Sequence, residues 1–306
     1  MFTFTQPLIK ETNVFSRLPD EYRRSDKKNA WSLANRGGAP VHSFLEGPVF
    51  DSRENLYVTD IPYGRIFKIT PAGEWSLVAE YDGEPNGMKF YDDKTLVIAD
   101  YKNGLLLLDV DSGQVSTLLD RRNTERFKGI NDLVFDSAGN LYFTDQGQTG
   151  LHDPTGRVYR LSLDGRLDCL LSNAPSPNGL VLSTDEEVLF VAMTRGNCVW
   201  RVPLMRDGSV SKVGQFFTSY GPSGPDGLAM DESGRLIVCN PGLGVGWVLN
   251  QKGEPEEVLK SVAGASLTNI AFGGANRSTA YFTESVTGTV LYTKMSAPGC
   301  KLYMAI

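Results

Sequence analysis

The residues of this chain that could act together in chemistry are carboxylates and carboxamides that recur at regular intervals. Each one precedes a short apolar run, and gaps of 40, 45, 47, 48 and 43 residues separate them. The six anchor residues are Glu46, Asn86, Asn131, Asn178, Asp226 and Asn269. If their side chains meet on one axis, their oxygen atoms form a cage that suits a hard divalent cation such as Ca²⁺, Mg²⁺ or Mn²⁺.

Four of the anchors provide the charge balance that such an ion needs. Glu46 and Asp226 supply two negative charges, and Asn131 and Asn178 supply neutral oxygen atoms. A divalent cation would cancel the two charges and relieve the repulsion between the carboxylates. We therefore predict a site for one divalent metal ion at these residues. Ca²⁺ is the expected ion, with Zn²⁺ and Fe²⁺ as further alternatives to Mg²⁺ and Mn²⁺.

Taken singly, most of these motifs also fit a plain turn, because Pro-Asn-Gly and Pro-Asp-Gly are common turn sequences. Turn chemistry would equally accept serine, lysine or glycine, and it gives no reason for Glu46. The recurrence of one residue class in six places therefore favours a shared site.

The anchors begin the units of a longer repeat of β-rich segments. A second run follows each anchor strand, as at residues 55–60 and 140–145, then a third, as at residues 65–69, and in most units a weaker fourth. Four short strands repeated about every 45 residues indicate a β-propeller blade. The chain is thus predicted to be all-β, a six-bladed β-propeller forming one domain over residues 1–306. No convincing amphipathic helix interrupts the pattern.

The last unit lacks an obvious long fourth strand after Thr293. We expect the N-terminal segment, around residues 8–15, to supply this strand and close the ring, which would remove two exposed sheet edges.

The blade geometry places the anchors at one mouth of the central channel. The first strand of a blade lies innermost, and the second runs antiparallel to it, so the end of the second strand reaches the same face. An outer ring is therefore predicted from Asp60, Asp100, Asp145, Arg195, Asn240 and Glu284.

Composition and motifs exclude several classes of protein. The longest unbroken apolar run has six residues, Val188 to Met193, whereas a membrane span needs about 20. The net charge is −6 with no basic stripe, which argues against nucleic-acid binding. Two histidines cannot build a multi-histidine metal site, and no G-x-S-x-G elbow, phosphate-binding glycine loop or C-x-x-C pair occurs. With no secretory signal visible, we expect four reduced cysteines in a cytoplasmic protein.

The ordered set of motifs resembles the gluconolactonase family, the six-bladed propellers that include regucalcin (senescence marker protein) and the luciferin-regenerating enzymes. The motifs are Leu45-Glu46-Gly47-Pro48, Gly129-Ile130-Asn131-Asp132, Pro177-Asn178-Gly179-Leu180, Pro225-Asp226-Gly227-Leu228 and Thr268-Asn269-Ile270-Ala271-Phe272-Gly273-Gly274, and the match covers residues 41–295. The resemblance implies one catalytic divalent ion held by residues matching Glu46, Asn131, Asn178 and Asp226. It also implies that Asp226 is the general base or nucleophile of a lactone hydrolase, a carboxylic-ester hydrolase. Related propellers split fluorophosphates and other esters.

One position departs from the pattern of the sugar-lactonase relatives. They resemble one another in carrying an arginine two positions before the asparagine of blade three, where it grips substrate hydroxyls, but this chain has Gly129 there. An aldonolactone is therefore not a secure expectation for the substrate. Lys128 is the nearest cation, and Asn86 is a further candidate for polar contact with substrate.

Two more substrate-binding candidates lie on predicted face loops. His152 lies in the longest loop, after Asp145, and Arg195 follows the second strand of blade four. For each, a structural contact is the alternative to contact with substrate.

The expected partner is a small-molecule lactone or ester, bound by a monomer or weak homodimer, with no nucleic acid or membrane. Two alternatives stay open: a phosphotriesterase-like or other ester hydrolase using the same metal site, and a propeller that only binds other proteins. The Gly-His and Trp-Asp dipeptides of interaction propellers are absent from the sequence.

Overall fold

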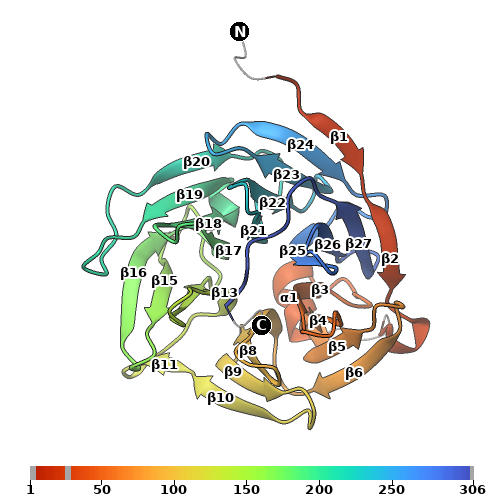
Figure 1. The fold of residues 1–306 in the computed structure, drawn as a ribbon. Coiled ribbons are helices and arrows are strands. Elements are labelled where there is room, and N and C mark those ends of the chain that lie inside the picture. Colours follow the sequence, from red (N-terminus) through yellow and green to blue (C-terminus); the bar gives the residue numbers. More distant parts are fainter. Residues whose placement is uncertain (1–4, 25–28, 304–306) are drawn as a thin grey trace.

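A ring of six β-sheets surrounds a central channel in the computed structural model, which describes residues 5–24 and 29–303 (Figure 1). In blades one to four the strands follow chain order from the channel outward, and in blades five and six an N-terminal strand is added at the outer edge. The prediction of an all-β, six-bladed propeller is confirmed.

The strands of the first four blades have five to eight residues each. Blades one to four consist of β3 (Leu45–Phe50), β4 (Leu56–Asp60), β5 (Arg65–Ile69) and β6 (Trp75–Glu80); β7 (Pro85–Phe90), β8 (Thr95–Asp100), β9 (Gly104–Asp109) and β10 (Val115–Leu119); β13 (Ile130–Phe135), β14 (Leu141–Asp145), β15 (Gly156–Leu161) and β16 (Leu167–Ala174); and β17 (Pro177–Leu182), β18 (Val188–Met193), β19 (Cys198–Pro203) and β20 (Gly214–Thr218).

The remaining elements complete the ring and its connections. Blade five holds β21 (Leu228–Met230), β22 (Leu236–Asn240), β23 (Val245–Leu249) and β24 (Pro255–Lys260), and blade six holds β25 (Leu267–Gly273), β26 (Thr279–Glu284) and β27 (Thr289–Lys294). Elsewhere lie β1 (Leu8–Glu11), β2 (Asn13–Arg17), a ribbon of β11 (Arg121–Arg122) and β12 (Glu125–Arg126), the 3₁₀ turns η1 (Asp20–Tyr22), η2 (Ile61–Tyr63) and η3 (Thr194–Gly196), and the helix α1 (Ala30–Arg36).

The core lies between neighbouring blades. The second strands β4, β14 and β22 are buried along their whole length, because each of their faces packs against an adjacent sheet. One apolar cluster, for example, joins Tyr57 and Ile66 of blade one to Met88 and Leu96 of blade two. Since each blade buries its faces on its neighbours, the positions of the inner strands are fixed by the whole ring.

The N-terminal segment closes the ring, as predicted, although it does so in two pieces. Strand β2 pairs antiparallel with β27 and becomes the outermost strand of blade six. Strand β1 instead pairs parallel with β24 and adds a fifth strand to blade five. The expected segment 8–15 therefore bridges the last two blades, and the fourth strand of blade six extends to Arg17.

The expectation that no helix interrupts the pattern is wrong for the connection between β2 and β3, where α1 lies. The side chain of Asn29 accepts a hydrogen bond from the backbone of Ser32 at 2.8 Å, and Gly37 ends the helix in a left-handed conformation. These caps satisfy backbone groups that a seven-residue helix would otherwise leave unpaired. The two turns are too short for an apolar periodicity to show in the sequence.

The four cysteines are unpaired. Across residues 5–24 and 29–303, no helix combines the length and the apolar character needed to cross a bilayer.

Candidate active site at one mouth of the channel

Five of the six anchors line one cavity of about 380 Å³ at the channel mouth: Glu46, Asn86, Asn131, Asn178 and Asp226. The sixth, Asn269, does not line it, and its amide instead donates to Oε2 of Glu46 at 2.8 Å. The predicted convergence is therefore confirmed for these five anchors. Asn269 supports Glu46 and is not a wall of the cavity.

Bulges at the start of the inner strands turn these side chains toward the channel. The pairing register shifts between Glu46 and Val49, and likewise between Pro85 and Met88 in blade two. Corresponding shifts occur in blades three, four and six. Because a bulge inserts an unpaired residue and re-aims its neighbours, it explains why consecutive polar residues reach the channel where strict alternation would hide one of them.

Glycines after the anchors leave room for the next blade. A Cβ atom on Gly47 would collide with the carbonyl oxygen of Asn86, and one on Gly179 would collide with that of Asp226. The backbones therefore approach more closely than any other residue would allow. Glycine at these places sets the spacing of the ring of anchors.

Threonine hydroxyls tie the anchor segment of one blade to its neighbour. Thr59 Oγ1 donates to the carbonyl of Asn86 at 2.9 Å, and Thr144 Oγ1 donates to the carbonyl of Asn178 at 2.8 Å. All four residues are buried, so each bond fixes one anchor backbone relative to the preceding blade.

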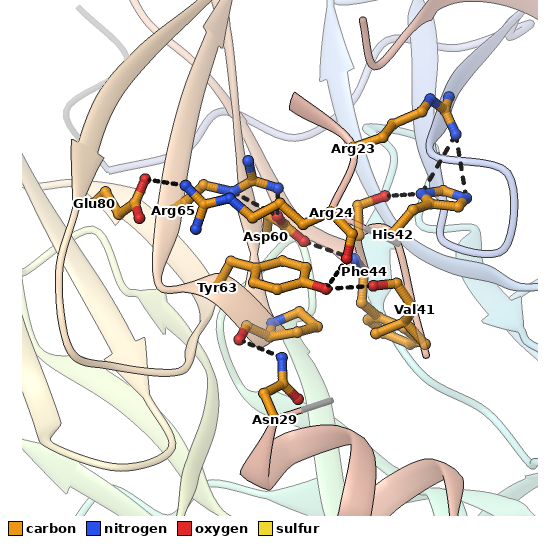
Figure 2. Close-up of polar contacts among 12 residues, drawn as sticks. Arg23, Arg24, Asn29, Val41, His42, Phe44, Asp60, Tyr63, Arg65 and Glu80 are labelled. Atoms are coloured by element: carbon orange, nitrogen blue, oxygen red, sulfur yellow. Dashed lines mark hydrogen bonds and ion pairs between the residues drawn. The ribbon is translucent and has the colours of Figure 1, made fainter. Parts of the chain in front are cut away.

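The segment that leads into Glu46 is held by a buried ion pair (Figure 2). Nε of Arg65 donates to Oδ2 of Asp60 at 2.9 Å, while the backbone N–H of Phe44 donates to Oδ1 of the same carboxylate at 2.7 Å. Asp60 thus belongs to the scaffold beneath the site.

Most of the other predicted outer-ring residues form hydrogen bonds with the backbone of nearby loops. Asp100 accepts the backbone N–H groups of Lys102 and Asn103, and Glu284 accepts those of Ser266 and Val286. Asp145 accepts from the backbone of Gly129, and Asn240 donates to the carbonyl of Gly224. Arg195 is the exception, because it is exposed and lines the cavity.

Glu46 is a buried carboxylate with an unusual protonation equilibrium. Its exposed fraction is 3%, and Oε2 accepts hydrogen bonds from the backbone of Gly47 at 2.7 Å and from Asn269. Burial raises the pKa of Glu46 to about 7, and the nearby charge of Asp132 adds to the shift. Near neutral pH, a cation close to this group would favour its ionised form.

Asp226, at the start of blade five, is a second buried carboxyl group of the same cavity. Burial raises its pKa well above the ordinary aspartate value, and the charges of Glu46 and Asp132 raise it further. A hydrogen bond from Asn178 and the charge of Arg195 oppose the shift. Part of the Asp226 residue surface stays accessible, although its carboxyl group is enclosed by protein. The two carboxylates therefore repel each other in an enclosed space.

A chain of amide hydrogen bonds orients Asn131. Nδ2 of Asn131 donates to Oε1 of Gln146 at 3.0 Å, and Nε2 of Gln146 donates to Oγ of Ser176 at 3.0 Å. Because the amide nitrogen of Asn131 is engaged with Gln146, its oxygen is the atom available to a ligand. Gln146 was not predicted as part of the site, and the only signal for it in the sequence is its place directly after the strand end at Asp145.

A third buried carboxylate, Asp132, was also not predicted as part of the site. Its Oδ1 accepts the backbone N–H of Leu133 at 2.8 Å, and its Oδ2 lies 3.4 Å from the amide nitrogen of Asn269. Burial raises the pKa of Asp132, and the charge of Lys89 opposes this shift. The bulge in blade three brings both Asn131 and Asp132 to the channel, which alternation alone would not suggest.

The predicted metal ligands fit a hard divalent cation by the chemistry of their donor atoms. Glu46, Asn131, Asn178 and Asp226 offer oxygen, with two carboxylates whose shared repulsion a divalent ion would relieve. In the described part of the chain, no group of three or more histidine, cysteine, aspartate or glutamate side chains could hold a metal. Any ion here would therefore depend on the asparagine carboxamides as well as the two carboxylates.

The predicted substrate contacts divide into two groups. Asn86 and Arg195 line the cavity. Lys128 does not: its ammonium group donates to Oγ1 of Thr155 at 2.5 Å. His152 is exposed and is likewise not among the residues that line the cavity.

Tyr101 accounts for the glycine at position 129. A Cβ atom on Gly129 would lie 2.5 Å from Cε2 of the Tyr101 ring, and the backbone there has a φ of 153°. The Tyr101 hydroxyl accepts a hydrogen bond from Nε2 of Gln148 at 3.0 Å, which helps to hold the ring at the cavity wall. A larger side chain at position 129 is therefore excluded unless Tyr101 moves.

Helix α1 adds an aromatic wall that the blade repeat does not provide. Trp31 packs on Phe44 with ring centroids 4.8 Å apart. The guanidinium carbon of Arg36 lies 5.3 Å from the centroid of the same Phe44 ring. All three residues line the cavity. The side chain of Asn29 ties the helix to blade one by donating to the carbonyl of Pro62 at 2.8 Å.

The chain shows clear similarity to known proteins. The family model described as "SMP-30/Gluconolactonase/LRE-like region" matches residues 44–286. Lactonase drp35 of Staphylococcus haemolyticus (strain JCSC1435) is 33% identical over 223 residues, covering 69% of this chain and 67% of that protein. Lactonase drp35 of Staphylococcus aureus (strain MRSA252) is 32% identical over 223 residues, covering 69% and 68%.

Solved structures show the same fold at lower identity. A calcium-binding protein, regucalcin, from Agrobacterium tumefaciens (strain C58) superposes with a TM-score of 0.76 at 20% identity, covering 97% of this chain and 98% of that one. A luciferin-regenerating enzyme gives a TM-score of 0.74 at 21% identity, covering 90% and 98%. From the match over residues 44–286 and the relatives above 30% identity, the chain belongs to the SMP-30/gluconolactonase/LRE-like family.

Proposed function

We propose that this protein is a divalent-metal-dependent lactonase that opens a small cyclic ester to a hydroxy acid. Family membership and the lactonase names of the relatives support the class of reaction. The observation that carries the proposal is the pair Glu46 and Asp226, two mutually repelling carboxylates at a cavity of about 380 Å³ that Asn131 and Asn178 also line. Such a pair requires either protonation or a cation.

Glu46, Asn131, Asn178 and Asp226 would hold the ion in this proposal. When bound, a divalent cation polarises an ester carbonyl and lowers the pKa of a bound water. Ca²⁺ is the ion we propose, because every donor is an oxygen atom. The fold shared with a calcium-binding regucalcin supports this choice.

Asp226 acts as the base in the proposed reaction. The oxygen of a water molecule adds to the ester carbonyl carbon while Asp226 accepts a proton from that water. The bond between the carbonyl carbon and the ring oxygen then breaks, and the ring oxygen takes up a proton to become the hydroxyl of the product. In the metal-free protein, burial raises the pKa of Asp226 above that of an exposed aspartate. A bound cation would oppose this shift and keep the carboxylate ionised, in the form that can accept the proton of the water.

Asn86 and Arg195 are the proposed substrate contacts. Both line the cavity, and the Arg195 guanidinium offers donors to a carbonyl or carboxylate oxygen. Lys128 and His152 are not among the lining residues, so they have no part in the proposed binding of substrate. Tyr101 occupies the wall beside Gly129, so the proposed binding of substrate uses no arginine at that position.

The proposal is tested by assaying the metal-stripped protein on a panel of lactones, carboxylic esters and phosphotriesters after loading with Ca²⁺, Mg²⁺, Mn²⁺, Zn²⁺ or Fe²⁺. We expect lactone opening that depends on a stoichiometric ion. Preferred phosphotriester turnover would indicate the alternative hydrolase, and no ion and no turnover would indicate a propeller that only binds other proteins. Glu46→Gln removes one of the two carboxylates and should weaken ion binding. Glu125→Gln is its matched control, because Glu125 pairs with Arg157 on the surface, away from the cavity.

A cytoplasmic location and a monomer or weak homodimer remain our predictions for the protein.

A further inference from the structure

The same central channel contains a second cavity of about 370 Å³, on the side of the inner strands away from the anchors. All six inner strands contribute to it through their later residues, and its apolar lining comes mainly from Val49, Phe50, Phe90, Val134, Leu180, Leu228, Ile270 and Phe272. We call this space the lower chamber. No residue that lines it also lines the cavity of the candidate site.

A polar layer separates the two cavities. Asn269 forms its centre, with its amide nitrogen 2.8 Å from Oε2 of Glu46 and 3.4 Å from Oδ2 of Asp132. Neither Asn269 nor Asp132 lines either cavity. The lower chamber is therefore a separate compartment and not an extension of the candidate active site.

The C-terminal segment forms the floor of the lower chamber. Figure 1 shows this segment, in dark blue, crossing the middle of the ring. The backbone N–H of Cys300 donates to the carbonyl of Met230 at 2.9 Å, and the Tyr303 ring packs on Phe135 with centroids 5.2 Å apart. Because these residues line the chamber, the chain itself encloses a largely apolar space in the channel.

The half-buried cation of the lower chamber, Lys89, lacks a matching anion at close range. Lys89 lines the chamber and is half-buried, and its ammonium group donates to the carbonyl of Met88 at 3.2 Å. Among the described residues, no carboxylate oxygen lies within 4.0 Å of that ammonium group. The charge of Asp132 acts on Lys89 only from farther away.

Most rim carboxylates of the chamber have partners elsewhere. Asp51 accepts the backbone N–H groups of its own turn, and Asp92 does the same in blade two. Glu54 accepts the backbone N–H of Gly274 at 2.7 Å. These acids are therefore engaged in turns, while Asp93 and Lys301 are exposed at the edge of the chamber. Lys89 is the half-buried cation available to a ligand inside it.

We propose that the lower chamber binds a small amphiphilic monocarboxylate, with its carboxylate on Lys89 and its apolar body against the ring of inner-strand side chains. An ammonium group donates strong hydrogen bonds to a carboxylate, particularly where water is partly excluded. An apolar cavity of this size readily accepts an apolar ligand, and its volume lies within the usual range of small-molecule pockets. The site requires neither the divalent ion nor the reaction proposed above.

The test uses octanoate as the probe and 1-octanol as an uncharged analogue of the same chain length, each titrated calorimetrically into the full-length protein. We expect one octanoate to bind per chain. Lys89→Met should weaken octanoate binding about tenfold or more and change octanol binding little. Methionine keeps the apolar stem of the side chain and removes the charge. Lys252→Met, on an exposed turn, is the matched control and should bind octanoate as the wild type does.

Two further variants locate the bound octanoate. Ala271→Leu adds bulk inside the lower chamber and should abolish binding of both probes, with folding checked by circular dichroism. Asp226→Asn, at the other cavity, should leave octanoate binding unchanged. The inference is overturned if octanoate does not bind, if Lys89→Met or a folded Ala271→Leu binds it as well as the wild type, or if Asp226→Asn abolishes binding.

Discussion

Asn269 donates a hydrogen bond to Oε2 of Glu46 across 223 residues of sequence, joining the last blade of the propeller to the first at the floor of the candidate site. The bond orients the Glu46 carboxylate and lowers its pKa against the effect of burial. Ring closure and the geometry of the site therefore depend on the same contact.

Removing this contact should destabilise the protein. In Asn269→Ala, both Glu46 and Asp132 lose a buried partner, and leaving such groups unsatisfied costs about 1–3 kcal/mol. We expect a loss of this size in the free energy of unfolding, measured by urea denaturation of the metal-free protein. Asn250→Ala, in an outer turn, is a control for loss of an asparagine outside the channel. Equal stability of Asn269→Ala and the wild type would contradict the role of this bond.

Gln146 should affect the affinity for the ion but not the rate of the reaction once the ion is bound. Gln146→Leu removes the acceptor that orients the Asn131 amide, and loss of such a supporting contact typically weakens metal binding about 10- to 100-fold. We expect weaker Ca²⁺ binding by calorimetry but near-normal turnover at saturating ion. Gln146→Glu keeps an acceptor for Asn131 and should recover part of the affinity. Gln148→Leu, next to the same loop, should bind the ion as the wild type does.

The metal-free protein should lose stability as the pH rises toward neutrality. Glu46 has a pKa of about 7 when folded and an ordinary value of 4.5, so the folded state holds the extra proton between these values. The free energy of unfolding therefore falls as pH increases through this window. For one group, the loss is about 1.4 kcal/mol for each unit by which its pKa is shifted. Asp226 shifts in the same direction.

Urea denaturation at pH 5 and pH 7.5 in chelator measures this dependence. Saturating divalent ion should oppose it, because the ion favours the ionised carboxylates. Glu46→Gln should flatten the profile of the metal-free protein. A metal-free protein that is more stable at pH 7.5 than at pH 5 would contradict the assigned electrostatics.

Deleting residues 1–16 should lower the melting temperature by several degrees or more. The deletion removes β1 and nearly all of β2, which exposes the edges of β24 and β27. Deleting only residues 1–7, which precede β1, is the control and should have little effect. A single cooperative transition in the full-length protein would support one domain over residues 1–306.

Much of the architecture followed from the sequence, because each blade repeats the same order of strands. The spacing of Glu46, Asn131 and Asp226 predicted their convergence, since an inner strand begins at the channel in every blade. Helix α1 did not follow, because it lies in a connection outside the repeat and has only two turns. Gln146 could not be assigned either, because its contacts with Asn131 and Ser176 depend on the conformation of the loop after β14.

The C-terminal floor of the lower chamber is another feature that the repeat did not predict. Its contacts, such as that between Cys300 and Met230, join segments far apart in the sequence. The sequence analysis placed Asn269 in the ring of anchors, but only the bulged geometry of blade six shows that it lies below Glu46.

The central claim is that Asp226 both holds the ion and accepts the proton, and Asp226→Asn at saturating Ca²⁺ tests it most directly. Asparagine keeps the size and an oxygen ligand but removes the charge and the basicity, so metal occupancy and lactone turnover must be measured on the same sample. We predict a variant that retains its ion while turnover falls by about 10²- to 10⁴-fold, the usual cost of losing a general base. A variant that retains its ion and opens lactones near the wild-type rate would contradict the claim.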